Sequence, residues 1–196
     1  MKYTLIGSTT SPYVRRLRIY LSSLHCEFQS MMIFDPKDRA TLKEISPILK
    51  IPVLKIEGNE STEYLYESRV IFNFINKTHF KQNVSLQEEN LLSVVEGVSD
   101  SLITLYLMKM SQVSIDEDKR FIAAQFERIE AGLKYLNDQV GPKNIPSCDY
   151  INISLYCLID WIKFRELTDL SAYRELESFH QEQCIRSDYK LTDPRS

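Results

Sequence analysis

The feature that most constrains how this chain can fold is its N-terminal segment, where a short apolar strand runs through a turn into a helix. Residues 2–6 (KYTLI) have the pattern of a short buried strand. Pro12 suits the first helical position, because its missing amide hydrogen would have no partner there and its φ angle is already helical. Ser11 is therefore predicted at or beside the helix N-cap, among free backbone amides and the positive end of the helix dipole. Such a position can hold an anion or a thiolate by hydrogen bonding.

The same segment lacks the two sulfur atoms that dithiol chemistry needs. A helix opening with Cys-Pro-Tyr-Cys would be typical of a thioredoxin-like disulfide enzyme, but Ser11 and Val14 take the places of both cysteines. Dithiol exchange at this motif is therefore excluded. The four cysteines lie elsewhere, at spacings typical of neither a metal site nor a disulfide framework: Cys26, Cys148, Cys157 and Cys184. With three scattered histidines, this pattern leads us to expect free thiols in a reducing cytosol and no metal site.

Two later segments also carry signals for a ligand site. Pro52 stands where a strand over 53–56 is expected to begin; it cannot donate to a central ladder, and its peptide bond can be cis. Glu67 and Ser68 form a polar pair at the start of a helix with an apolar face. A second helix N-terminus is thus predicted, able to receive a ligand.

A change of pattern divides the chain into two parts. Up to about residue 77, short strands alternate with helices, in an order that predicts a parallel strand pair followed by an antiparallel hairpin. A polar linker over 78–84 follows. After it, the apolar residues recur at helical spacing over long stretches. We therefore expect an α/β domain over residues 1–79 and an all-helical domain over residues 86–196.

Local signals predict the ends of several helices in the second part. Ser85 and Glu88 have the spacing of a capping box at the start of the first long helix. Gly141 is expected to end a later helix, and Pro146-Ser147 to open the next.

Composition and charge limit the classes of partner that the chain is expected to bind. The formal net charge is −3, and the only basic cluster covers residues 15–18, so nucleic acid is not expected as a partner. That cluster is interpreted as a helix face whose arginines hold local carboxylates. No apolar leader follows Met1, and no apolar run approaches the ~20 residues of a membrane span, so we expect a soluble, cytoplasmic protein without a membrane partner.

The order and spacing of these segments resemble the glutathione transferase family, most closely its bacterial serine-type members. Three segments match the family: SPYVRRLR at 11–18, LKIPVL at 49–54 and YES at 66–68. A long helix from Asp149 and a C-terminal tail extend the resemblance over nearly the whole chain. The resemblance implies a thioredoxin-like N-terminal domain, a helical C-terminal domain, a cis bond before Pro52 and a homodimer. It also implies glutathione as co-substrate, conjugated through its thiolate to a small hydrophobic electrophile in a detoxification reaction.

Each candidate site residue has a chemical role in that reaction. The nucleophile is a thiolate, and a free thiol has a pKa of about 8.5, so a nearby donor is needed near pH 7. The Ser11 hydroxyl is the candidate donor at the helix start, with Thr10 and Thr9 as alternatives and a simple N-cap as its ordinary role.

The chain also has candidate groups for the rest of glutathione, which is a tripeptide. Ile51 is the candidate backbone clamp on the cysteine of glutathione, and Lys50 the partner of its glycine carboxylate. Glu67 would take the γ-glutamyl ammonium and Ser68 the carboxylate beside it. The ordinary roles of these residues are solvation for Lys50 and helix capping for Glu67 and Ser68.

Two other functions stay open at this point. One is a glutathione-transferase-like binding or regulatory protein with little turnover. The other is a glutathione-dependent reductase or peroxidase that uses one of the four cysteines, which is less favoured because none lies in the motif. The electrophile cannot be named from the sequence; Trp161, Tyr106 and Phe164 are candidates for a hydrophobic substrate pocket between domains, or for the core.

Overall fold

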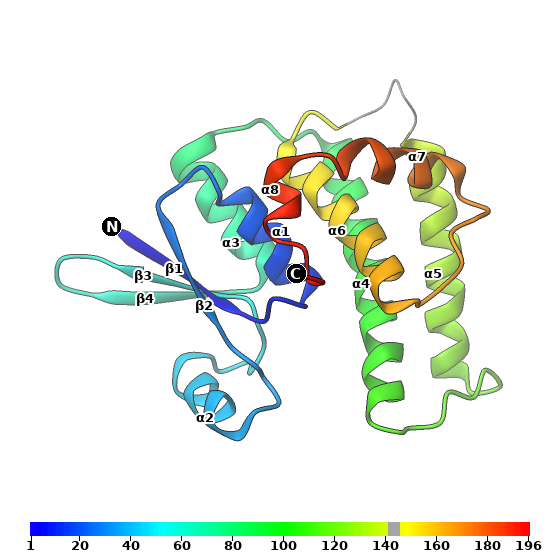
Figure 1. Cartoon of the computed structure of the whole chain (residues 1–196), viewed down its shortest axis with the longest axis horizontal. Coiled ribbons are helices and arrows are strands. Elements are labelled where there is room, and N and C mark those ends of the chain that lie inside the picture. Colours follow the sequence, from blue (N-terminus) through cyan, green and yellow to red (C-terminus); the bar gives the residue numbers. More distant parts are fainter. Residues whose placement is uncertain (141–145) are drawn as a thin grey trace. The chain divides into compact units, whose positions relative to one another are not determined.

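The computed structural model describes residues 1–140 and 146–196 (Figure 1). They form two compact units, one of Met1–Asn83 together with Arg186–Ser196 and the other of Val84–Ile185. The C-terminal segment thus belongs with the N-terminal unit, although the sequence places it with the helical part. The expected division into domains over residues 1–79 and 86–196 stays a prediction.

The first unit is built on a four-stranded mixed sheet. Its elements in chain order are β1 (Lys2–Gly7), α1 (Pro12–Tyr20), β2 (Cys26–Ser30), α2 (Pro36–Ile45), β3 (Val53–Glu57), β4 (Thr62–Tyr66), α3 (Ser68–Ile75), the π-helical turn η1 (Asn76–Phe80) and, from the C-terminal segment, α8 (Ser187–Lys190). The strand order is β2-β1-β3-β4, with β1 parallel to β2 and β3 antiparallel to both of its neighbours. The predicted parallel pair and hairpin are confirmed, whereas the predicted linker begins inside η1.

The register of the sheet brings three chain segments to one of its ends. Ile6 lies opposite Val53, and Val53 lies opposite Tyr66. Therefore β1 ends where β3 begins and where β4 ends. The loops that leave or enter the strands at this end carry the residues predicted to bind glutathione.

Gly7 allows α1 to pack closely against β1. A Cβ atom at this position would lie 2.4 Å from Cγ2 of Val14, which is fully buried on α1. Any side chain larger than hydrogen would therefore displace the helix. The short turn that results determines where Ser11 lies relative to the end of the sheet.

The second unit is helical. It contains α4 (Leu86–Met110), α5 (Arg120–Gln139), α6 (Asp149–Arg165) and α7 (Arg174–Gln183). In the described part of the chain, α4 alone is long and apolar enough to cross a membrane, which corrects the expectation that no segment reaches that length. Six of its apolar side chains are buried in the core of this unit, whereas three nearer its two ends are exposed: Leu91, Leu92, Val95, Val98, Leu102 and Leu105 are buried, and Leu86, Leu107 and Met110 are exposed. We conclude that α4 is a core helix.

The Glu88 carboxylate stabilises the starts of two helices. Its Oε2 atom accepts from the Ser85 amide at 2.9 Å, which confirms the predicted capping box of α4. Its Oε1 atom accepts from the amides of Ser147 and Cys148, at 2.7 and 3.0 Å, at the start of α6. Burial alone would raise the pKa of Glu88, but these hydrogen bonds and those from the two serine hydroxyls lower it from 4.5 to about 2.

Helix α6 therefore begins with a cap supplied from another helix. The predicted opening at Pro146-Ser147 is corrected by a few residues, because the helix starts at Asp149 and its N-cap residue, Cys148, makes no side-chain cap bond. The Glu88 carboxylate accepts hydrogen bonds from two backbone amides at this helix start and so replaces the missing side-chain cap. The prediction that Gly141 ends a helix lies outside the described residues.

Candidate functional site

The candidate site is the end of the sheet where β1 and β4 stop and β3 starts. Ser11 follows β1, Ile51 and Pro52 directly precede β3, and Glu67 and Ser68 directly follow β4. Segments that are far apart in sequence thus supply their side chains at the same end of the sheet. All five residues were predicted from the sequence, and the register explains why they converge.

Ser11 is the N-cap residue of α1. Its backbone is extended, and its Oγ atom accepts a hydrogen bond from the Val14 amide at 3.4 Å. The hydroxyl proton takes no part in that bond, so capping α1 and donating to a thiolate are compatible roles. Of the two alternatives, Thr10 has its hydroxyl 3.1 Å from the Ser8 hydroxyl.

The segment before β3 presents both backbone and charge. The Ile51–Pro52 peptide bond is cis, the isomer that the sequence resemblance implies. Ile51 precedes the first pair of the β1–β3 ladder, so its amide and carbonyl lie outside the ladder. Lys50 is exposed, and its Nζ atom lies 3.8 Å from Oε1 of Glu67. Two residues predicted to bind different ends of glutathione therefore contact each other in this structure.

Glu67 has an unusual backbone conformation. Its φ angle is 68° and its ψ angle 134°, a region that side-chain-bearing residues rarely adopt. The residue precedes α3, its side chain makes no cap bond to the helix, and it is exposed. Conformations of this kind concentrate at functional sites, where the surrounding structure holds them. The geometry leaves the carboxylate of Glu67 turned away from helix capping.

Ser68 is buried, with 2% of its surface exposed, and its Oγ atom accepts a hydrogen bond from the Arg16 guanidinium. Arg16 lies on α1 and is itself 2% exposed. The interpretation of residues 15–18 as a face that holds local carboxylates therefore missed this contact. The sequence offers one signal, because the two arginines lie between the buried Val14 and Leu17 of the same helix.

Arg15 connects the C-terminal segment to α1. Its Nη2 atom donates to the carbonyl oxygen of Tyr189 at 3.1 Å, and its Nε atom donates to Oγ1 of Thr192 at 3.4 Å. Arg15 and Tyr189 are both buried. A cation at the carbonyl end of α8 also suits the dipole of that short helix. The helix that carries Ser11 is thus held by residues at the far end of the chain.

The chain is similar to known proteins over most of its length. A family described as "Glutathione S-transferase, N-terminal domain" matches residues 10–78. YibF, an uncharacterized GST-like protein of Escherichia coli K12, is 22% identical over 173 residues that cover 83% of each chain. The resemblance to the glutathione S-transferase family is thus confirmed.

Two solved structures show the same fold. A glutathione S-transferase from Methylobacillus flagellatus KT with glutathione bound has a TM-score of 0.82 at 19% identity, covering 98% of this chain and 100% of that one. Another, from Methylobacterium radiotolerans in complex with glutathione sulfonate, has a TM-score of 0.80 at 20% identity, covering 98% and 94%. The predicted fold class, a thioredoxin-like sheet followed by a helical part, is confirmed.

The second unit brings together the three aromatic side chains predicted for a substrate pocket or core. Tyr106 on α4 and Trp161 on α6 meet edge to face, with ring centroids 5.5 Å apart. Phe164 joins them through Arg165, whose guanidinium lies over the rings of both Phe164 and Tyr106. Trp161 is buried, whereas the other three side chains are half-buried.

The structure disfavours reactivity at two of the four cysteines. Cys148 and Cys157 are buried, and Cys26 and Cys184 are half-buried. Burial raises the pKa of the Cys26 and Cys148 thiols, which disfavours the thiolate needed for redox chemistry. Within residues 1–140 and 146–196, no three histidine, cysteine or acidic side chains gather as a metal site.

Proposed function

We propose that this chain binds glutathione at the end of its sheet and conjugates the thiolate to a small hydrophobic electrophile. One observation carries the proposal. Three groups lie at the same end of the sheet. They are the Ser11 hydroxyl at the N-cap of α1, the Ile51 backbone beside the cis-proline and outside the strand ladder, and the N-terminus of α3. These groups match the thiol, the cysteine backbone and the γ-glutamyl end of glutathione. Relatives of the same fold have been solved with glutathione bound.

The proposed chemistry needs only thiolate stabilisation and placement. Ser11 donates its hydroxyl proton to the sulfur in a hydrogen bond, and the amides at the start of α1 add their partial positive charge. The glutathione thiol loses its proton to solvent more readily as a result. The thiolate then attacks the electrophilic carbon, a carbon–sulfur bond forms, and the leaving group departs with its electron pair. No covalent bond to the protein is required.

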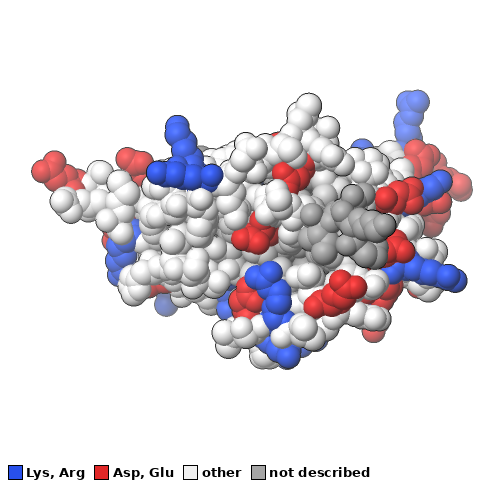
Figure 2. Space-filling view, turned by 90° about the horizontal axis from the view of Figure 1, so that it is seen from above, with Lys and Arg blue, Asp and Glu red and all other residues white. Residues whose placement is uncertain are grey.

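The remaining contacts hold the tripeptide in place. The Ile51 amide and carbonyl bind the backbone of the cysteine, Lys50 binds the glycine carboxylate, and Glu67 and Ser68 bind the γ-glutamyl ammonium and carboxylate. Lys50 and Glu67 are 71% and 52% exposed, so their mutual ion pair contributes little and is easily exchanged for ligand contacts. We propose a cytoplasmic homodimer that acts in detoxification, without nucleic acid, membrane or metal partners. On the face seen in Figure 2, acidic and basic side chains are interspersed among uncharged ones.

The test has two steps. Isothermal titration calorimetry with glutathione should show saturable binding below millimolar concentration, and a coupled assay with a generic aryl halide should show glutathione-dependent turnover. Absence of glutathione binding up to millimolar concentration would contradict the proposal. Binding without turnover of several electrophiles would instead identify a glutathione-binding or regulatory protein.

A further inference from the structure

The first turn of α1 holds Ser11 through its own backbone. The Val14 amide donates to Oγ of Ser11 at 3.4 Å, and the Arg15 amide donates to the Ser11 carbonyl oxygen at 2.9 Å. A shift of this turn would therefore move the Ser11 hydroxyl with it. Val14 is fully buried beside Gly7 of β1. The Arg15 side chain projects about 100° further around the helix, so it contacts a different part of the first unit.

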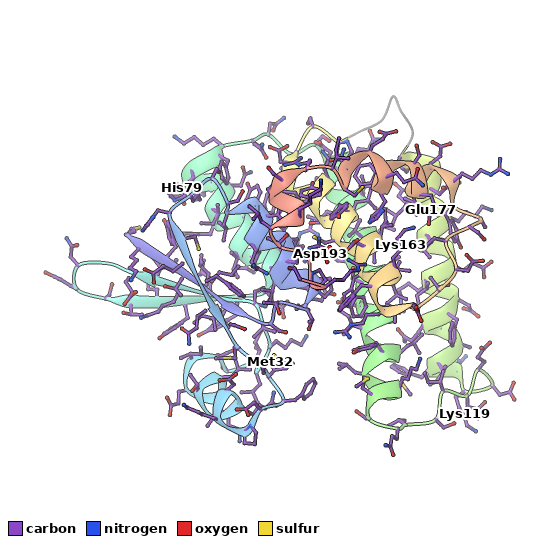
Figure 3. The ribbon with its side chains drawn as sticks, viewed as in Figure 1. Met32, His79, Lys119, Lys163, Glu177 and Asp193 are labelled. Carbon is purple, nitrogen blue, oxygen red and sulfur yellow. The ribbon has the colours of Figure 1, made fainter. Side chains whose placement is uncertain are left out.

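Arg15 joins this turn to the C-terminal segment, Arg186–Ser196. Its Nη2 atom lies 3.1 Å from the Tyr189 carbonyl oxygen, and its Nε atom lies 3.4 Å from Oγ1 of Thr192. Figure 3 labels the next residue, Asp193, and shows it beside the start of α1. The last residues of the chain therefore lie against the turn that carries the candidate thiolate donor.

The C-terminal segment is held in one conformation by contacts of its own. The Arg186 guanidinium donates to both carboxylate oxygens of Asp188, at 2.7 and 3.2 Å, and its Cζ atom lies 4.4 Å from the ring centroid of Tyr189. Oγ1 of Thr192 lies 3.2 Å from the carbonyl oxygens of both Asp188 and Tyr189. The two acceptors that Arg15 meets are therefore fixed in place.

Arg15 is buried, with 3% of its surface exposed, so water cannot readily replace its hydrogen bonds to this segment. A buried donor that loses its acceptor costs more free energy than the same loss at the surface, and the cost is larger for a charged group. Movement of α1 away from the C-terminal segment is therefore disfavoured. This precision matters for Ser11, because a hydrogen bond weakens steeply as its angle departs from linear.

We propose that Arg15 is a positioning residue, through which the C-terminal segment holds the Ser11 hydroxyl in place for the glutathione sulfur. Arg15 acts through Ser11 and needs no contact with the ligand. The inference rests on the proposed function and adds a regulating element to it, because the C-terminal segment would then influence the rate of conjugation.

Titration of bound glutathione by its ultraviolet thiolate absorbance measures this effect in the full chain. Arg15→Met keeps much of the apolar stem but removes both hydrogen bonds. We expect the thiol pKa to rise by about half a unit to one unit, which is roughly a three- to tenfold change in its acid dissociation constant. The affinity for glutathione should change by less than about threefold, because every residue assigned to the ligand is retained.

The matched control is Arg195→Met. This arginine belongs to the same segment and pairs with Asp193, with 39% of its side chain exposed. Its substitution should leave the thiol titration unchanged. An unmoved titration in Arg15→Met, or an equal shift in Arg195→Met, would overturn the proposal.

Two variants of Thr192 keep the charge of Arg15. Thr192→Val removes one acceptor with almost no change in shape, whereas Thr192→Ser retains the hydroxyl. We expect the thiol pKa to rise in Thr192→Val and to keep its value in Thr192→Ser, and this pair preserves the test if Arg15→Met does not fold. A rise in Arg15→Met without one in Thr192→Val would mean that the charge of Arg15 acts on the thiolate directly, and would overturn the proposal.

This inference and the proposed function fail in different ways. If the unchanged chain does not bind glutathione, or binds it without lowering the thiol pKa, the proposed function is wrong and this inference is wrong with it. If the unchanged chain lowers the thiol pKa and the Arg15 and Thr192 variants lower it equally, the proposed function stands and the inference alone is wrong.

Discussion

The guanidinium of Arg16, on α1, donates a hydrogen bond to the hydroxyl of Ser68, the first residue of α3. A guanidinium has no acceptor, so the Ser68 oxygen must be the acceptor and the Ser68 proton points elsewhere. The buried positive charge lies beside a helix N-terminus, where both favour an anion. Arg16 therefore supports the place proposed for the γ-glutamyl carboxylate without being exposed to solvent.

Substitution of this arginine should weaken glutathione binding. Arg16→Gln removes the charge but keeps a donor, and we expect a loss of affinity of about tenfold, within the range for a charged hydrogen bond. Calorimetry should also be run with a glutathione analogue that lacks the γ-glutamyl carboxylate, which should lose much less affinity. Arg18→Gln, on the same helix but stacked on Phe28, is the control. An equal loss for both ligands would mean that Arg16 only supports the fold.

The Glu88 carboxylate should contribute to stability in a pH-dependent way. Its folded pKa of about 2 is below its ordinary value of 4.5, so its contribution is fully present above pH 4.5 and is lost as the pH falls towards 2. Glu88→Gln should lower the free energy of unfolding at pH 7 by about 1–2 kcal/mol, at the lower end for charged hydrogen bonds because the side chain is only half-buried. Denaturant unfolding at several pH values measures the difference.

The control for Glu88 is Glu127→Gln, which changes an exposed carboxylate on α5 of the same unit. It should leave the free energy of unfolding almost unchanged at every pH. If Glu88→Gln destabilises the protein equally at pH 7 and near pH 2, the ionised carboxylate is not the group that caps α4 and α6.

Glu67 should affect glutathione binding more than it affects stability. Glu67→Gln removes the charge that pairs with the γ-glutamyl ammonium, and we expect binding to weaken by about 1–3 kcal/mol. The free energy of unfolding should change by less than about 1 kcal/mol, because the Lys50–Glu67 pair is exposed. A deaminated glutathione should bind the variant and the unchanged chain equally well. A variant that still discriminates against the deaminated ligand as strongly would show that another group binds the ammonium.

Local signals in the sequence were sufficient for the strands and for the helix starts that carry the site. Pro12 indicated the beginning of α1 and so placed Ser11 at the cap, and Glu88 indicated the capping box of α4, because each signal acts within one helical turn. That the three segments meet at one end of the sheet is a finding of the strand register, which no local signal in the sequence predicted.

Contacts between distant positions were not predictable in the same way. Ser68 lies 52 positions from Arg16, Tyr189 lies 174 positions from Arg15, and Ser147 lies 59 positions from Glu88. Neither composition nor periodicity says which buried arginine meets which hydroxyl, because that depends on how helices pack. The sequence therefore predicted a generic basic face where the structure has two arginines with specific hydrogen bonds.

The central claim is that Ser11 stabilises a glutathione thiolate, and titration of bound glutathione by its ultraviolet thiolate absorbance tests it most directly. We predict a thiol pKa below the free value of about 8.5 in the unchanged chain, and a rise of about one to two units in Ser11→Ala, since a charge-assisted hydrogen bond contributes about 1.5–3 kcal/mol. Turnover at neutral pH should fall roughly ten- to a hundredfold, with a smaller loss at higher pH. Glutathione affinity should change little, because the other contacts remain. If Ser11→Ala leaves the titration unmoved while Thr10→Ala or Thr9→Ala shifts it, the donor is a different hydroxyl; if none of the three shifts it, the catalytic account is wrong.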